Sequence, residues 1–382
     1  MHTRLGFALL AASFSWGCSP AQESQPPPLP GPLGEWENTV FESGSDGYHT
    51  YRIPALIKTK TGSLLAFCEG RISGRSDSGD IDLLMRRSTD FGQSWGPMQV
   101  VWNDESHTCG NPCPVIDRET GRIILLMTHN LGDDHESEII AGKSRGTRTV
   151  WVTHSDDDGL NWSPPRNITA KTKQADWTWY ATGPGVGIQL ASGRLVVPCD
   201  HIEADTKNYY SHTIHSDDGG KTWSLGGRSG PQMNECQVVE LADGRLLLNM
   251  RNYKRSEHRA RGIAFSEDRG QSWSTPRWND ALIEPRCQAS LISFPALNDE
   301  RGTCLLFSNP AHENKRLRMR IKLSHDSGKT WPLGRTLHEG PSAYSCLALL
   351  ADDGIGCLFE AGEKSPYEQI RFTRVLLETL SR

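Results

Sequence analysis

Ser88-Thr-Asp-Phe-Gly-Gln-Ser-Trp95 is the first of five copies of the pattern Ser-x-Asp-x-Gly-x-x-Trp, a unit named the box below. The other copies begin at Ser155, Ser216, Ser266 and Ser324, at spacings of 67, 61, 50 and 58 residues. Ser and Asp side chains can bond nearby backbone N–H groups and close a turn, and Gly accepts a positive φ. Trp can anchor such a turn onto a sheet. Five copies at these intervals predict a repeat architecture.

The composition favours a turn-rich β protein. The chain of 382 residues contains 12 Trp, 37 Gly and 22 Pro, and its formal charge is −5. Aromatic residues favour strands, whereas Gly and Pro favour turns. The charge shows no basic excess of the kind that nucleic-acid binding requires, so we expect no nucleic-acid partner.

The first residues are typical of an export signal. Arg4 precedes the apolar run Leu5–Phe14, which is too short to span a bilayer, so residues 1–18 are predicted to be a signal peptide. Ser15-Trp-Gly-Cys18 also resembles a lipoprotein cleavage site, which would make Cys18 a lipid anchor, although Trp16 fits such a site poorly. We therefore expect an exported protein that is secreted, periplasmic or membrane-anchored.

Two further segments complete the expected organisation. The Pro-rich residues 19–35 are predicted to be an extended linker, and residues 36–382 to be the folded domain, which we expect to be monomeric. Most of the ten cysteines lie in apolar runs and are interpreted as small buried hydrophobic residues. Cys109 and Cys113 flank a turn and are the pair to check for a disulfide. No Cys or His spacing indicates a metal site, so we predict no metal and no cofactor.

A second repeat lies between the boxes. Six segments share the plan strand, Gly-containing turn, strand, which predicts hairpins: 53–69, 113–129, 186–200, 236–251, 287–309 and 344–360. Each of the first five is followed by a box, so the unit is a hairpin, a third strand, a box and a fourth strand. Six such units predict an all-β fold, a six-bladed β-propeller of four-stranded antiparallel blades. A stacked solenoid is the alternative, although the repeating unit is longer than is usual for an all-β solenoid.

The direction of the strands assigns two faces. The boxes belong to one face, and the opposite face receives the residues before each first strand and after each second strand. Before first strands these are Arg52, 180–183, Glu235, Arg286 and Tyr344; after second strands they are Glu69, Arg71, His129, Asn130, Asp200, Arg251, Asn309 and Glu360. This mixture of arginines, carboxylates and tyrosines around one channel predicts an anion-binding active site.

The boxes resemble the Asp box of the sialidase (neuraminidase) superfamily, and other motifs extend the resemblance from about Trp36 to Leu377, closest to bacterial and lysosomal-type sialidases. Tyr51-Arg-Ile-Pro-Ala55 looks like the family's Arg-Ile-Pro motif, which implies that Arg52 is the first of three arginines that bind the sialic acid carboxylate. Asn249-Met-Arg-Asn252 resembles the motif of the second, Arg251. For the third, the family pattern selects Arg316, and Arg318 is its rival.

The same resemblance implies the remaining roles. Glu69-Gly-Arg71 looks like the motif of a fourth active-site arginine, and Asp77 matches the acid/base aspartate, with Asp80 and Asp82 as alternatives. The other matches are Glu235, which activates the nucleophile; Tyr344, the nucleophile; and Glu360, which orients Arg52.

The implied activity is that of an exo-α-sialidase, a glycoside hydrolase that releases terminal sialic acids from glycans, glycoproteins or glycolipids with retention and through a tyrosine-linked intermediate. Most retaining glycosidases attack with a carboxylate, and tyrosine sialidases are the exception. A carboxylate nucleophile about 4 Å from the substrate carboxylate would be repelled by about 4 kcal/mol at an effective dielectric constant of about 20, and a phenol avoids this cost. A non-catalytic sialoglycan-binding propeller is the alternative, as is a sialidase that acts by transfer or intramolecular release.

Overall fold

The computed structural model describes residues 1–2, 34–294, 302–350 and 354–380. The chain from Gly34 onward is one compact unit. Its described part consists of strands and short connections, with helices α1 (Glu136–Ala141) and α2 (Thr169–Thr172) and the 3₁₀ turn η1 (Leu377–Thr379). No helix within the described residues is long and apolar enough to cross a membrane. The predicted all-β fold class is confirmed.

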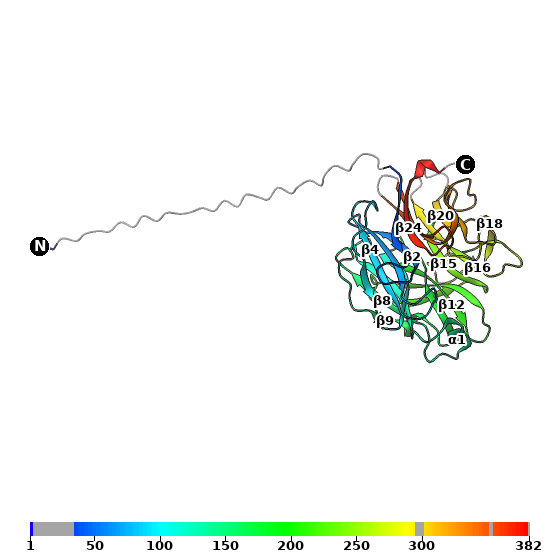
Figure 1. Cartoon of the computed structure of the whole chain (residues 1–382), viewed down its shortest axis with the longest axis horizontal. Helices are drawn as coiled ribbons and strands as arrows, with labels where there is room; N and C mark the ends of the chain where they lie inside the picture. The colour runs from blue at the N-terminus through cyan, green and yellow to red at the C-terminus, as the bar shows by residue number, and fades with distance from the viewer. Residues whose placement is uncertain (3–33, 295–301, 351–353, 381–382) are drawn as a thin grey trace. The chain divides into compact units, whose positions relative to one another are not determined.

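Hydrogen bonding joins the described strands into four sheets, which contain six antiparallel groups of successive strands; Figure 1 shows the strands along the coloured chain. Within a group, strands that follow one another in sequence are paired neighbours, with one exception in the third group, where the first strand is divided. The first three groups are β2 (Thr50–Lys58), β3 (Leu64–Arg71), β4 (Ile81–Ser88) and β5 (Gln99–Trp102); β6 (Thr108–Ile116), β7 (Ile123–Asn130), β8 (Thr149–Ser155) and β9 (Arg166–Asn167); and β10 (Trp177–Thr182) with β11 (Ile188–Gln189), β12 (Leu195–Glu203), β13 (Tyr209–Ser216) and β14 (Ser224–Arg228).

The last of the other three groups joins the two ends of the folded chain. These groups are β15 (Met233–Glu240), β16 (Leu246–Asn252), β17 (Ala260–Ser266) and β18 (Arg277–Ile283); β19 (Ser290–Phe294), β20 (Cys304–Pro310), β21 (Leu317–Ser324) and the first half of β22 (Leu333–Leu349); and the second half of β22, β23 (Gly354–Ala361), β24 (Gln369–Leu376) and β1 (Trp36–Glu42). The N-terminal strand β1 thus completes the one group that has no box.

These pairings confirm the six predicted hairpins, with one departure. In the third group the first strand is divided, because both β10 and β11 pair with β12. The interruption contains Pro184, which has no N–H to donate to a ladder. The hairpin around Gly193 is therefore formed by β11, while β10 lies nearer the other end of β12.

In the first and fourth groups the first strand is far more buried than the last. All residues of β3 and all but the last of β2 are buried, whereas no residue of β5 is. Strands β15 and β18 show the same contrast. First strands of neighbouring groups also contact one another, as β2 does with β6 and β22. The apolar core consists of clusters that join neighbouring groups, such as Val115 and Leu126 with Val197 and Ile214.

The five boxes form the turns that join third to fourth strands, and their hydrogen bonds repeat. In every box the Ser hydroxyl donates to the Asp carboxylate at 2.7–2.8 Å and accepts the Gly N–H at 2.8–2.9 Å. The Asp carboxylate accepts the N–H two residues after the Gly at 2.8–2.9 Å. Each box Gly has a φ between 81° and 87°. The predicted turn chemistry is confirmed.

Ser216→Ala should destabilise the protein because it removes hydrogen bonds of the third box and leaves the other four boxes unchanged. The change removes the acceptor of the Gly220 N–H and a donor to Asp218. We expect the free energy of unfolding to fall by about 1 kcal/mol, as for a typical lost hydrogen bond. Urea denaturation followed by tryptophan fluorescence measures the loss. Lys221→Ala, in the same turn, is the matched control, and an equal loss in both variants would argue against the hydrogen bonds as the cause.

The nine cysteines within the described residues are all buried free thiols, which confirms their interpretation as small hydrophobic residues. Cys109 and Cys113 are therefore not bridged. Of the predicted signal peptide, residues 1–18, the structure describes only residues 1–2. Cys18 and most of the predicted linker over 19–35 lie outside the described residues.

Candidate active site

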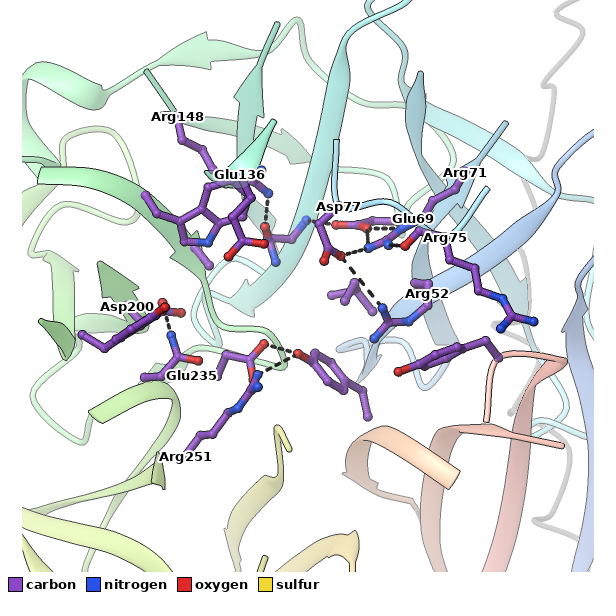
Figure 2. Close-up of a pocket in the computed structure, with 18 of the residues that line it drawn as sticks. Arg52, Glu69, Arg71, Arg75, Asp77, Glu136, Arg148, Asp200, Glu235 and Arg251 are labelled. Carbon is purple, nitrogen blue, oxygen red and sulfur yellow. Dashed lines mark hydrogen bonds and ion pairs between the residues drawn. The ribbon is translucent and has the colours of Figure 1, made fainter. Parts of the chain in front are cut away.

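A cavity of about 370 Å³ opens where the first strands of the groups begin and the second strands end, and Figure 2 shows ten of its residues labelled. Its lining consists of Arg52, Ile53, Glu69, Arg71, Arg75, Asp77, Asn111, Glu136, Arg148, Trp179, Ala181, Asp200, Tyr209, Asn234, Glu235, Arg251, Tyr253, Arg316, Tyr344 and Tyr367. Seven of the eight predicted site residues are among these, and Glu360 contacts the lining from behind. No box residue lines the cavity.

Irregular strand pairing aims three of these side chains into the cavity. The register shifts in β2, β15 and β22, at positions that bracket or adjoin Arg52, Glu235 and Tyr344. A β-bulge bends its strand and redirects a side chain, and bulges are frequent beside functional sites. The bulges thus explain why residues from three separate sheets converge.

Ile53 shows how strongly the β2 bulge is held. Its φ is 60°, in the left-handed region that β-branched residues rarely adopt. Its N–H donates to Glu360 Oε1 at 2.9 Å, and its side chain is buried against Tyr344. The surrounding contacts maintain a strained backbone next to Arg52, as is common at functional sites.

Tyr344, Glu235 and Arg251 form one hydrogen-bonded cluster. The Tyr344 hydroxyl donates a short hydrogen bond to Glu235 Oε1. Arg251 Nη1 donates to Glu235 Oε2 at 2.6 Å and to Tyr344 Oη at 3.1 Å. Burial and the Glu235 carboxylate raise the pKa of Tyr344 well above its ordinary value, although nearby arginines oppose this. The phenol is therefore protonated at neutral pH, and Glu235 is placed to accept its proton.

Glu360 holds both Arg52 and the backbone of Tyr344. Its carboxylate accepts hydrogen bonds from Arg52 Nε at 2.7 Å and from the Tyr344 N–H at 3.1 Å. Glu360 is fully buried and Arg52 is buried. Charge-assisted bonds of this kind fix a guanidinium in one direction, so Glu360 sets the position of Arg52 relative to Tyr344.

Asp77 lies at the cavity mouth and is held by arginines. Arg71 Nη2 donates to Asp77 Oδ1 at 2.7 Å, and Arg52 Nη1 lies 3.9 Å from the same oxygen. Arg71 is fixed in turn by Glu69, whose Oε2 accepts its Nε at 3.0 Å. Desolvation raises the pKa of Asp77, but the charges of Arg71 and Arg52 outweigh it, so the pKa lies below its ordinary value. The Asp77 side chain is 49% exposed and can meet a ligand.

The structure places Arg316 in the cavity and Arg318 outside it. Arg316 Nη1 donates to Tyr367 Oη at 2.7 Å, and its Cζ lies 5.4 Å from the centroid of the Tyr344 ring. The Arg318 side chain is 60% exposed and its Nε lies 3.5 Å from Glu339. Arg52, Arg251 and Arg316 therefore approach Tyr344 together, an arrangement that suits a carboxylate ligand.

Comparisons with known proteins agree with this geometry. A family model described as a BNR repeat-like domain matches residues 62–357. Sialidase-3 of Mus musculus is 34% identical over 391 residues, which cover 88% of this chain and 93% of that relative. The chain belongs to the sialidase family.

Other sialidases are similar over most of this chain. The sialidase of Micromonospora viridifaciens is 36% identical over 375 residues, covering 92% of this chain and 56% of the relative. The solved structure of Hadza microbial sialidase Hz136 aligns with a TM-score of 0.81 at 32% identity, covering 90% of this chain and 69% of that one. The chain therefore spans little more than half the length of the Micromonospora relative and nearly all of the mouse one.

Several residues predicted at this face of the sialidase fold do not reach the cavity: Tyr180, His129, Asn130, Arg286 and Asn309. His129 instead bonds Asp104 at 2.7 Å, and Asn309 donates to a backbone carbonyl at 2.8 Å. Side chains alternate between the two faces of a strand, so a residue at the correct strand end can still point into a neighbouring sheet.

Asp80 and Asp82, the alternatives to Asp77, also lie outside the cavity lining. Asp82 is buried and accepts hydrogen bonds from Tyr48 Oη at 2.6 Å and Asn103 Nδ2 at 2.5 Å. The Asp82 carboxylate thus links strand β4 to the neighbouring segments that carry Tyr48 and Asn103, which is a structural role.

Several lining residues of this sialidase were not predicted as site residues from the sequence, among them Arg75, Glu136, Arg148, Tyr209, Tyr253 and Tyr367. Tyr253 lies two residues after Arg251, so a wider window after each second strand would have found it. Glu136 and Tyr367 lie in the connections between second and third strands, β7 to β8 and β23 to β24. Every group has such a connection, but the connections differ in length, so the repeat marks no position within them. Burial and the Asp77 charge raise the pKa of Glu136.

Proposed function

We propose that the protein is an exo-α-sialidase that hydrolyses terminal sialic acids from glycans, glycoproteins or glycolipids with retention of configuration. The hydrogen-bonded cluster of Tyr344, Glu235 and Arg251, beside Arg52 and Arg316, carries the proposal. A site that only binds a glycan has no need of a carboxylate that can deprotonate a phenol. Similarity to the Micromonospora sialidase and to mouse sialidase-3 supports the same reaction.

We further propose that the six groups close into a six-bladed propeller around the cavity. Contacts between successive groups join β2 to β6, β6 to β10, β12 to β15, β15 to β19, β19 to β22 and β22 to β2. This series returns to its starting strand. The pairing of β1 with β24 supports the closure, because the two ends of the domain share one blade.

The three arginines would bind the carboxylate of the substrate. Arg52 is oriented by Glu360 and Arg251 by Glu235, while Arg316 stands over the Tyr344 ring. Guanidinium groups donate paired bonds in a fixed plane, and a lysine would lose that geometry. Binding at this point places the anomeric carbon, which carries the carboxylate, next to Tyr344.

Two steps then complete hydrolysis. In the first, Glu235 accepts the proton of Tyr344, the phenol oxygen bonds the anomeric carbon, and Asp77 protonates the departing glycosidic oxygen. In the second, Asp77 accepts a proton from water as the water oxygen displaces Tyr344, and Glu235 returns the proton to the phenol. Both displacements invert the anomeric carbon, so the product retains the configuration of the substrate.

The substrate also prepares Asp77 for its acid role. In the free protein, Arg71 and Arg52 lower the pKa of Asp77, which favours the ionised form. A bound carboxylate offsets the charge of Arg52, so the pKa of Asp77 should rise in the complex. Substrate binding and protonation of the acid are therefore coupled through Arg52.

This coupling predicts a specific pH dependence. The descending limb of kcat/KM reports Asp77 in the free protein, and the limb of kcat reports it in the complex. We expect the descending limb of kcat to lie at a higher pH than the descending limb of kcat/KM. Arg71→Gln removes a positive charge and should move the kcat/KM limb to higher pH, whereas the exposed Arg145→Gln should not. Profiles with sialyllactose measure both limbs, and a limb that moves to lower pH in Arg71→Gln would contradict the coupling.

Proton NMR of sialyllactose turnover tests the proposed function directly. Retaining hydrolysis releases the α-anomer of free sialic acid first, before it converts to the β-anomer in solution. Release of the β-anomer first would contradict the proposal. An anhydro sugar or a sialylated acceptor would favour transfer, and binding without any release would favour a glycan-binding protein.

The expected export of the protein, as a secreted, periplasmic or lipid-anchored form, stays a prediction from the N-terminal sequence. The same holds for the monomeric state.

A further inference from the structure

Tyr367 contacts two of the arginines that surround Tyr344. Its hydroxyl accepts a hydrogen bond from Arg316 Nη1 at 2.7 Å, and its ring centroid lies 4.2 Å from Arg52 Cζ. The Tyr344 ring lies 5.1 Å from Arg52 Cζ and 5.4 Å from Arg316 Cζ. Two tyrosines and two arginines thus alternate in a closed cycle on one wall of the cavity.

Arg316 is bound by neutral acceptors, unlike the other three arginines that were predicted to form the site. Arg52, Arg71 and Arg251 each form an ion pair with a buried glutamate. Within the described residues Arg316 forms no ion pair: its guanidinium donates to the Tyr367 hydroxyl and, at 3.3 Å, to the backbone oxygen of Arg286. Neutral acceptors hold a guanidinium in place without neutralising its charge.

We propose that Tyr367 is a positioning residue that directs Arg316 toward the substrate carboxylate and spaces it from Arg52. The role rests on the proposed function, in which that carboxylate is the ligand. A glutamate at position 367 would fix Arg316 equally well, but it would compete with the substrate for the same charge. A phenol avoids the competition, and its ring can stack on the face of Arg52.

The loop that carries Tyr367 is held in place by contacts that involve no ligand. The Glu368 carboxylate accepts three backbone N–H groups of the loop at 2.8–3.0 Å. Ser43 Oγ donates to the Tyr367 carbonyl at 2.8 Å. The position of Tyr367 is therefore set before substrate arrives, which is the condition for a positioning role.

The same contacts separate Tyr367 from the nucleophile. The Tyr344 hydroxyl donates to Glu235, which can accept its proton. The Tyr367 hydroxyl accepts from Arg316, and no carboxylate within the described residues bonds it. Of the two tyrosines in the cycle, only Tyr344 has a base.

Binding of 2,3-didehydro-2-deoxy-N-acetylneuraminic acid to Tyr367→Phe tests the role, since the ring stays and only the acceptor is lost. By isothermal titration we expect Kd to rise about tenfold, or about 1.4 kcal/mol. The methyl ester of the same compound lacks the negative charge, and its Kd should change less than about threefold. Tyr210→Phe, outside the cavity, is the matched control. Unchanged affinity for the acid, or equal weakening for acid and ester, would overturn the role.

Turnover of a fluorogenic α-sialoside separates this inference from the proposed function. For Tyr367→Phe we expect KM to rise about tenfold, with kcat within about threefold, because the lost contact orients the carboxylate in both the ground and transition states. A wild type that binds the acid but does not turn over would overturn the proposed function alone. A wild type that binds neither acid nor ester would overturn both proposals. A thermal unfolding midpoint equal to that of the wild type shows that each variant is folded.

Discussion

Tyr344→Phe lowers kcat for an α-sialoside by at least about 10³-fold, the scale on which loss of a nucleophile acts. The change removes a single oxygen atom, which is the atom that would bond the anomeric carbon. The fold should persist, because Glu235 and Arg251 still bond each other at 2.6 Å and the Tyr344 N–H still donates to Glu360. Turnover of a fluorogenic substrate, with thermal unfolding measured on the same preparation, checks both statements.

The matched control for Tyr344→Phe is Tyr210→Phe, which removes a hydroxyl from a buried tyrosine outside the cavity. We expect it to keep wild-type kcat. A Tyr344→Phe variant that is folded and retains kcat within about tenfold of the wild type would show that the phenol oxygen is dispensable, and would contradict the proposed mechanism.

Glu360→Ala should lower the free energy of unfolding by about 3–5 kcal/mol, the cost of removing one partner from a buried ion pair. Arg52 would be left buried without its carboxylate, and the N–H groups of Ile53 and Tyr344 would lose their acceptor. Because the same contacts orient Arg52 and Tyr344, turnover should also be lost. Urea denaturation followed by tryptophan fluorescence measures the stability.

Glu37→Ala provides the comparison for Glu360→Ala. Glu37 also pairs with an arginine, Arg371, at 3.2 Å, but the Glu37 side chain is 37% exposed. Solvent screens such a pair, so we expect a loss of no more than about 1 kcal/mol. Similar losses in the two variants would indicate that burial of the Glu360 pair is not what makes it important.

The repeat architecture could be predicted from the sequence because its signals are local. Each box contains its own hydrogen-bonding partners within five residues, from the Ser to the Gly N–H. The hairpins likewise place strand-forming runs on both sides of one turn. Even the site was approximately placed, since strand direction alone assigns Arg52, Glu235 and Tyr344 to the face away from the boxes.

The remaining features depend on contacts between distant parts of the chain. The bulges that aim Arg52 and Tyr344 are stabilised by Glu360, more than 300 residues from Arg52 in the chain. Whether Arg316 or Arg318 faces the cavity depends on a left-handed residue in the strand, since Arg318 has a φ of 62°. Alternation along a regular strand would not separate these two residues. Tyr367 lies in the connection between β23 and β24, whose counterparts in the other groups differ in length, so no repeat position points to it.

Reaction of the protein with a 2,3-difluoro sialic acid, followed by proteolysis and mass spectrometry, examines the nucleophile itself. The fluorine at C3 slows both steps, whereas the fluoride that departs from C2 is a good leaving group and keeps the first step fast, so the covalent intermediate should accumulate. We expect one added sugar, on the peptide that contains Tyr344, and none in Tyr344→Phe. A sugar on Asp77 or Glu235 would show that a carboxylate attacks, and a sugar on Tyr367 would show that the other tyrosine does; each result would contradict hydrolysis through Tyr344.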